Sequence, residues 1–225
     1  MRGGLPLVIL IWIQHSMIFL PQPALCRTLS WLIGAAFFSI GGVAAGAFTD
    51  VTSSVAPGLP SVKVAWGDYN NDGFVDMSVN GSVWHNNNGV NFFRSTTAST
   101  GGDGTDGIWG DYDNDGWLDF FNYTRGIVHR SNNGISFSSM SIPSLGIAPN
   151  IRGASWGDHN NDSYLDLYVG GYESWPNAYY SDVRLRNNGG TGFSNVWTQP
   201  TPRPGRGITS ADFDRDGDID VYTSN

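Results

Sequence analysis

Aspartate and asparagine recur on alternate residues at four places in this sequence. Counted from the first aspartate of each place, side-chain oxygens fall at positions 1, 3, 5 and 9, and glycine occupies position 6 in three of the four. A calcium ion takes about six to eight oxygen ligands, which short acidic arms, a sharp turn and an inward backbone carbonyl at position 7 can supply. The expected ligands, with position 7 contributing its carbonyl, are Asp68, Asn70, Asp72, Phe74 and Asp76 in loop one; Asp111, Asp113, Asp115, Trp117 and Asp119 in loop two; Asp158, Asn160, Asp162, Tyr164 and Asp166 in loop three; and Asp212, Asp214, Asp216, Asp218 and Asp220 in loop four.

An EF-hand, a magnesium site and a plain tight turn each fit the four loops less well. An EF-hand requires a bidentate glutamate at position 12, where these loops carry Val79, Asn122, Val169 and Thr223. Magnesium prefers a smaller octahedral site that retains water. A tight turn accounts for Asp-Asn-Asp-Gly, but not for a further aspartate at position 9 in all four loops. We therefore expect up to four Ca²⁺ ions, one per loop.

The loops differ in two ways that bear on affinity. Loop three has Ser163 where the others have glycine, so a left-handed turn there costs roughly 1 kcal/mol. At positions 1, 3, 5 and 9, loops two and four have four carboxylates each, and loops one and three have three. We expect tighter binding in loops two and four, with stronger repulsion in the absence of metal.

The loops belong to a longer repeat. Four passages align over their whole length: VAWGDYNNDGFVDMSV from Val64, GIWGDYDNDGWLDFFN from Gly107, ASWGDHNNDSYLDLYV from Ala154 and TSADFDRDGDIDVYTS from Thr209. The first aspartates are separated by 43, 47 and 54 residues, a period typical of propeller blades. In the first three units an Asn-Gly-type turn follows the loop passage, which indicates a hairpin.

Each repeat is predicted to form four short strands, which in the first unit are Ser61–Trp66, Phe74–Val79, Ser82–His85 and Asn91–Thr96. The predicted fold class is therefore all-β, with β-propeller blades built as four-stranded antiparallel repeats. Trp66, Trp109 and Trp156 precede three of the loops and are expected to pack one blade on the next. The fourth unit has Ser210 at this place, so weaker packing is expected there.

Composition narrows the partners. The 225 residues include 20 acidic and 12 basic side chains, for a formal net charge of −8. This charge argues against binding nucleic acid or an anionic membrane.

Residues 1–47 contain two apolar runs, and the second begins after Arg27 and ends at Ala45-Gly46-Ala47. That pattern predicts an export signal, with a retained membrane anchor as the alternative. The expected organisation is a targeting segment, 1–47, and propeller repeats, 48–225, in a secreted, periplasmic or cell-surface protein.

Around WGDYDNDGWLD, which begins at Trp109, the sequence resembles the FG-GAP and VCBS repeat family. The similarity is greatest to its secreted, ASPIC/UnbV-associated type, and it extends in plan to the propeller of integrin α chains. It covers about residues 48–225, where Phe48–Thr52 resembles the family's end-of-blade strand. The resemblance implies calcium in the four loops and a larger, typically seven-bladed ring. Only Val221–Asn225 follow loop four, so we expect a fragment of three blades and part of a fourth.

No catalytic constellation is expected in residues 48–225. The histidines are interpreted as following the repeat, with His85 and His129 at one strand position and His159 at loop position 2. The passage that departs most from the repeat is the insertion Gly170–Asp182, whose aromatic residues could form a ligand loop. Its candidate residues are Tyr172, Trp175, Tyr179 and Tyr180.

Two functions remain open from the sequence. The first is an exported calcium-binding interaction module for adhesion or for binding an extracellular protein or ligand. The second is a carbohydrate-binding or accessory domain of a polysaccharide-active enzyme whose catalytic part lies outside this chain. The insertion favours the second function, and the repeat with its export signal favours the first.

Overall fold

The computed structural model describes residues 49–101, 106–142, 151, 153–171, 173–174, 178–201 and 207–224. The predicted targeting segment, 1–47, lies outside the described residues. The chain divides into two compact units, Met1–Thr52 and Ser53–Asn225, and every described strand lies in the second. In the described part of the chain, no helix has the length and apolar character that crossing a membrane requires.

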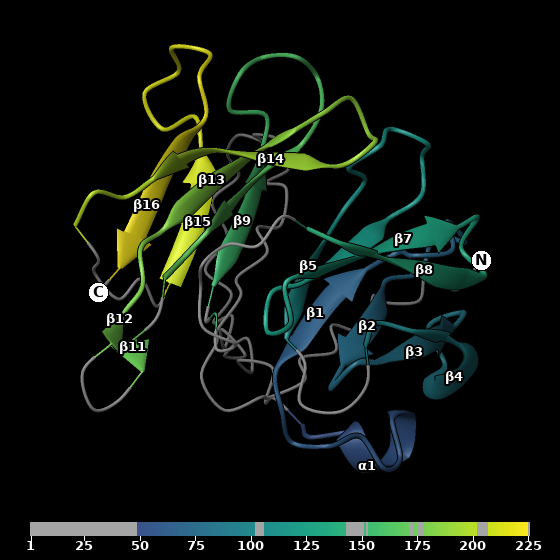
Figure 1. The fold of residues 1–225 in the computed structure, drawn as a ribbon. Helices are drawn as coiled ribbons and strands as arrows, with labels where there is room; N and C mark the ends of the chain where they lie inside the picture. The colour runs from purple at the N-terminus through teal and green to yellow at the C-terminus, as the bar shows by residue number, and fades with distance from the viewer. Residues whose placement is uncertain are drawn as a thin grey trace, which may run out of the picture. The chain divides into compact units, whose positions relative to one another are not determined.

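The described chain forms three four-stranded antiparallel sheets and two two-stranded ones, of which the first is a hairpin inserted into the third four-stranded sheet (Figure 1). Within each sheet, neighbouring strands in space are neighbours in sequence, apart from one inserted hairpin. The strands are β1 (Val64–Gly67), β2 (Asp76–Val79), β3 (Ser82–Asn87) and β4 (Asn91–Ser99); β5 (Gly107–Gly110), β6 (Asp119–Asn122), β7 (Ile127–Asn132) and β8 (Ser136–Ser141); β9 (Ala154–Gly157), β10 (Asp166–Val169), β13 (Val183–Asn187) and β14 (Phe193–Thr198); and β15 (Gly207–Ala211) and β16 (Asp220–Ser224).

The first strands of successive sheets contact one another in the order β1, β5, β9 and β15. Consecutive antiparallel sheets that meet through their first strands are the arrangement of propeller blades. The predicted fold class is confirmed: the described chain forms three complete blades and the first hairpin of a fourth. The boundaries differ from the sequence prediction by a few residues, because the loops themselves are not strand.

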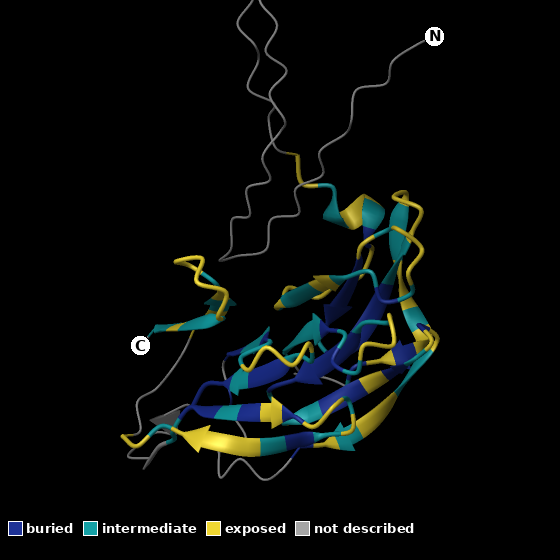
Figure 2. Cartoon of the chain, turned by 90° about the horizontal axis from the view of Figure 1, so that it is seen from above, coloured by how far each residue is buried: buried dark blue, intermediate teal, exposed yellow. Residues whose placement is uncertain are grey.

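Burial falls from the middle of each blade to its outer edge (Figure 2). Every residue of β2 and β6 is buried, whereas β4, β8 and β14 are largely exposed. A strand with covered faces on both sides carries a continuous apolar run, as Phe120 and Phe121 show in β6. The core therefore lies between blades.

In the second and third blades, a tryptophan packs against a glycine of the blade before it. A Cβ atom on Gly67 would lie 2.8 Å from the Trp109 ring, and one on Gly110 would lie 2.8 Å from the Trp156 ring. The Trp109 indole N–H also donates to the Ala65 carbonyl at 3.1 Å. These contacts confirm the expected blade-to-blade role of the two tryptophans, while Trp66 in the first blade is 41% exposed.

The fourth hairpin packs less closely, as the sequence predicts. No residue of β15 or β16 is buried, and Figure 2 shows this hairpin without buried residues beside the C label. Ser210 stands in place of the tryptophan. Ile219 instead approaches Gly157 of the third blade, with its Cγ2 2.8 Å from the place of a Cβ.

Two local features lie outside the blade pattern. The insertion in the third blade forms a hairpin of its own, β11 (Glu173–Ser174) with β12 (Ala178–Tyr179), between β10 and β13. Helix α1 spans Thr52–Val55. The end-of-blade strand expected at Phe48–Thr52 is absent from its described residues, because 49–51 form no strand and Thr52 begins the helix.

Candidate metal centres

Each Asp-rich loop joins the first and second strands of its sheet, and all four share one backbone conformation. The position-1 carboxylate accepts the N–H groups of positions 5 and 6, at 3.2 and 2.9 Å from Asp68 in loop one. The same pair of bonds recurs in the other three loops. The position-5 carboxylate accepts the N–H of position 7 at 2.8–3.0 Å in every loop. Repetition of the sequence therefore produces repetition of the geometry.

Positions 4 and 6 of each loop adopt the left-handed region. At position 6 the φ angle is 86° for Gly73 and Gly116 and 94° for Gly217. Ser163 keeps this conformation with φ 71°, as its place in the repeat predicts. Loop three therefore retains the shared shape at a conformational cost that glycine avoids.

The position-9 aspartate is the most buried member of loops one to three. Asp76, Asp119 and Asp166 are each 0% exposed. One oxygen of each accepts a backbone N–H from the third strand of its blade, at 2.7–2.8 Å. The other oxygen of Asp76 and of Asp166 has no hydrogen-bond partner among the described residues. In loop three Nδ1 of His159 lies 4.0 Å from that oxygen of Asp166.

Burial makes these carboxylates poor anions without a counter-charge. Desolvation raises the pKa of Asp76 to about 6 and that of Asp119 to about 7. It also raises the pKa of Asp166. A buried carboxylate oxygen without a donor costs free energy that a bound cation would offset. The donor set thus fits a hard divalent cation.

Two loops bring three carboxylates together. The oxygens of Asp111, Asp113 and Asp119 lie within 4.8 Å of one another, as do those of Asp212, Asp214 and Asp216. Both groups could hold a metal ion, and they lie in the loops with carboxylates at all four of positions 1, 3, 5 and 9. Loops one and three have Asn70 and Asn160 at position 3, so their oxygen sets combine three carboxylates with an amide.

Basic side chains on the third strand reach the loops, a feature that the sequence pattern did not indicate. Arg130 of β7 pairs with Asp113 through Nε and with Asp115 through Nη2, the latter at 2.9 Å. His85 of β3 lies 3.3 Å from the Asp76 carboxylate and 3.7 Å from that of Asp72. Both residues directly precede the residue that donates its N–H to the position-9 carboxylate.

This register corrects the interpretation of the histidines. His85 corresponds to Arg130, while His129 corresponds to Trp84, since Trp84 pairs with Met77 and His129 pairs with Phe120. His129 therefore points away from the loop and is buried. Counting backward from the Asn-Gly turns would have given this alignment.

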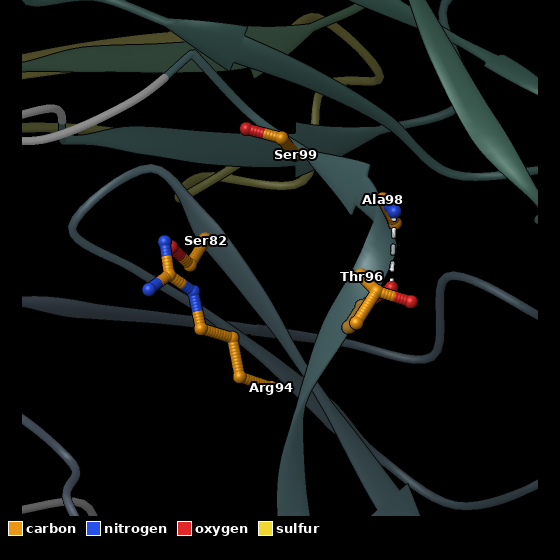
Figure 3. A pocket seen from close by; sticks show the side chains of 6 residues that line it. Ser82, Arg94, Thr96, Ala98 and Ser99 are labelled. Atoms are coloured by element: carbon orange, nitrogen blue, oxygen red, sulfur yellow. Dashed lines mark hydrogen bonds between the residues drawn. The ribbon is translucent and has the colours of Figure 1, made fainter.

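The predicted ligand loop is only partly described. Tyr172 and Trp175 lie outside the described residues, and the side chain of Tyr179 in β12 is likewise outside them. Tyr180 follows the hairpin and is partly buried. An open hollow of about 510 Å³ lies elsewhere, on β3 and β4 (Figure 3). It contains none of the predicted site residues and is lined by Ser82, Arg94, Ser95, Thr96, Ala98 and Ser99.

Comparison with known proteins returns no match, neither a family model nor a curated protein. The fold and the loops therefore define the class by themselves: a β-propeller repeat protein with Asp-rich clusters that could hold metal ions.

Proposed function

We propose that this chain is an exported calcium-binding β-propeller module of the FG-GAP/VCBS type, which binds a protein partner outside the cell. The observation that carries the metal part is the buried position-9 carboxylate, which leaves an oxygen without a donor in loops one and three. Its place in four loops of the same backbone shape supports one ion per loop.

Calcium suits these loops better than other common divalent cations. All the side-chain ligands are oxygens, and calcium accepts a flexible set of them, including backbone carbonyls. The proposed ligands are the twenty positions given for the four loops above. The ion would offset the repulsion among carboxylates that lie within 4.8 Å of one another and so tie the first two strands of each blade together.

A thermal unfolding experiment tests the metal part. Calcium at ten times its dissociation constant would add roughly 1.4 kcal/mol per site, so the melting temperature should rise with calcium and fall with chelator. Asp119→Asn should reduce the calcium-dependent increment. Asp106→Asn is the matched control, because Asp106 lies outside the loops and pairs with the exposed Lys63. A melting temperature that changes with neither calcium nor chelator would contradict the proposal.

The module is proposed to act in adhesion or surface assembly and to perform no catalysis itself. Propeller blades stiffened by ions offer rigid loops to a partner, as extracellular interaction modules require. Fractionation of cells that produce the full chain, followed by protease treatment of intact cells, tests the location. Retention in the cytoplasm would contradict the export part alone.

A carbohydrate-binding or accessory role is the second candidate, and a feature of the third blade favours it. Tyr168 and Trp197 lie 6.1 Å apart between ring centroids, and Trp197 is 41% exposed. The pair lies near the base of the β11–β12 hairpin, where Asp182 binds both the Tyr168 hydroxyl and the Gly171 N–H. Binding on a glycan array that Trp197→Ala abolishes would favour this candidate, and a blank array would count against it.

A further inference from the structure

The fourth residue of each of the first three loops reaches the loop of the next blade. Asn71 donates from Nδ2 to the Gly116 carbonyl at 2.7 Å, and Asn114 donates to the Ser163 carbonyl at 2.9 Å. Asn161 donates to Oδ1 of Asp218 at 2.8 Å. These bonds join residues 45, 49 and 57 positions apart in sequence. The loops are therefore linked in series from the first blade to the fourth.

In loops two and three, the accepting carbonyl belongs to a peptide group whose N–H donates to the position-5 carboxylate of the same loop. The Gly116 carbonyl shares its peptide with the Trp117 N–H, which donates to Asp115 at 3.0 Å. The Ser163 carbonyl shares its peptide with the Tyr164 N–H, which donates to Asp162 at 2.9 Å. One peptide group is thus held at its oxygen by the preceding blade and at its nitrogen by the position-5 carboxylate.

We propose that Asn71, Asn114 and Asn161 are positioning residues that orient the next loop for its cation, so that each loop's affinity depends on the asparagine of the blade before it. This inference rests on the proposed calcium function. In loops two and three, fixing the peptide between positions 6 and 7 orients both the position-5 carboxylate and the position-7 residue. In loop four, Asn161 holds the side chain of the position-7 residue instead. Either contact lowers the ordering cost of binding.

Backbone preference alone does not account for the asparagines. All three have φ angles of 55–59°, a region that asparagine tolerates well. Arg215 holds the same position in loop four with φ 64°, so the conformation does not require asparagine. A glycine at position 4 would keep the left-handed backbone but remove the side-chain donor. Substitution by glycine therefore separates the effect of backbone conformation from the effect of the hydrogen bond.

Calcium titration followed by amide NMR on the full chain measures the loops one by one. The N–H groups of Gly116 and Gly217 bond to the position-1 carboxylates of loops two and four, so each reports its own loop. Asn71→Gly should raise the calcium midpoint at Gly116 by about three- to ten-fold, the value of one hydrogen bond, and leave Gly217 unchanged. Asn161→Gly should raise the calcium midpoint at Gly217 and leave that at Gly116 unchanged. Asn71→Asp, which also tolerates the left-handed backbone but cannot donate, should repeat the effect of Asn71→Gly.

The outcomes separate the inference from the function on which it rests. Calcium titration of Gly116 and Gly217 with unchanged midpoints in both variants would overturn the linkage and leave the calcium function standing. An equal shift at both glycines in either variant would also overturn it, because that result indicates general destabilisation. Absence of any calcium response in the wild-type protein would overturn the function and the inference together.

Discussion

The buried carboxylate at loop position 9 is the residue on which the metal proposal depends most. Asp76 and Asp166 each place one oxygen on a backbone N–H of the third strand and leave the other without a donor among the described residues. Such an oxygen costs about 1–3 kcal/mol or more for a charged group. In loops two and four the corresponding oxygen accepts the N–H of position 2, at 3.1 Å from Tyr112 and 3.3 Å from Phe213. The donorless oxygens of the first and third blades indicate a missing counter-charge rather than a local defect.

A substitution at Ser163 tests the free-energy cost of a non-glycine residue at loop position 6. Ser163→Gly should raise the free energy of unfolding by about 0.5–1 kcal/mol, because glycine adopts the left-handed region without a Cβ penalty. A Cβ at the equivalent Gly73, Gly116 or Gly217 would meet nothing within 4 Å, so crowding is not involved. Denaturant unfolding measures the change, with Gly116→Ser as the reverse control. A destabilised Ser163→Gly would contradict this origin of the cost in loop three.

Arg130 is predicted to stabilise loop two when calcium is absent and to weaken the binding of calcium to it. It pairs with Asp113 and Asp115 but is 45% exposed, so its contribution is limited to about 0.2–1 kcal/mol. Arg130→Gln should destabilise the calcium-free protein, since the carboxylates lose a counter-charge. It should also strengthen calcium binding, since a competing cation is removed. Calorimetric titration checks the affinity, and a weaker affinity in Arg130→Gln would contradict the prediction.

His129 should make the protein less stable in mild acid. Burial, with a smaller contribution from Arg125, lowers the pKa of His129 below its ordinary value of 6.5. The unfolded chain therefore binds a proton more readily than the folded one, and the stabilisation present above pH 6.5 is lost as the pH falls below it.

His129→Leu removes this dependence, and Leu185 at the equivalent place in the third blade shows that leucine fits there. The drop in melting temperature from pH 7.5 to pH 5.5 should be smaller in the variant than in the wild type. The acidic groups are common to both proteins, so their effects cancel in the comparison. Equal drops would refute the role of His129.

At the scale of the element, each of the three complete blades has a glycine at the end of its first strand, against which the next blade packs. Gly110→Ala would place a Cβ 2.8 Å from the Trp156 ring and should cost about 1–3 kcal/mol through overpacking. Gly207→Ala is the matched strand control, because its Cβ would meet chiefly the small Ser224 hydroxyl. Thermal unfolding distinguishes them. Similar melting temperatures for the two variants would contradict close packing of Trp156 between the second and third blades.

The strands and loops could be predicted from the sequence because their signals are local. Alternation, the Asn-Gly turns and the Asp-rich passages each lie within about a dozen residues and repeat at a blade-sized period. The same repetition identified Trp109 and Trp156 as packing residues.

The contacts that cross between segments could not be predicted in this way. Whether Arg130 or His129 faces loop two depends on a one-residue register, and a one-residue slip reverses the face of a strand. The bond from Asn71 to Gly116 joins residues of two blades, so no local pattern reveals it. The β11–β12 hairpin departs from the repeat, and repetition gives no template for it.

At the scale of the whole molecule, the proposed ions would offset most of the net negative charge. The chain carries a formal net charge of −8, and the propeller repeats without Arg2 and Arg27 carry −10, which four calcium ions would reduce to −2. Fifteen of the 20 acidic residues lie in the four loops, so the charge is concentrated where the ions are proposed to bind. The blades should therefore gain stability together as calcium is added.

The most direct test is equilibrium calcium binding to chelator-treated protein, followed by calorimetric titration. We predict saturable binding of up to four ions per chain, with affinity reduced by Asp119→Asn and unchanged by Asp106→Asn. Absence of saturable binding at millimolar calcium, in protein that is folded by circular dichroism, would contradict the proposed calcium function.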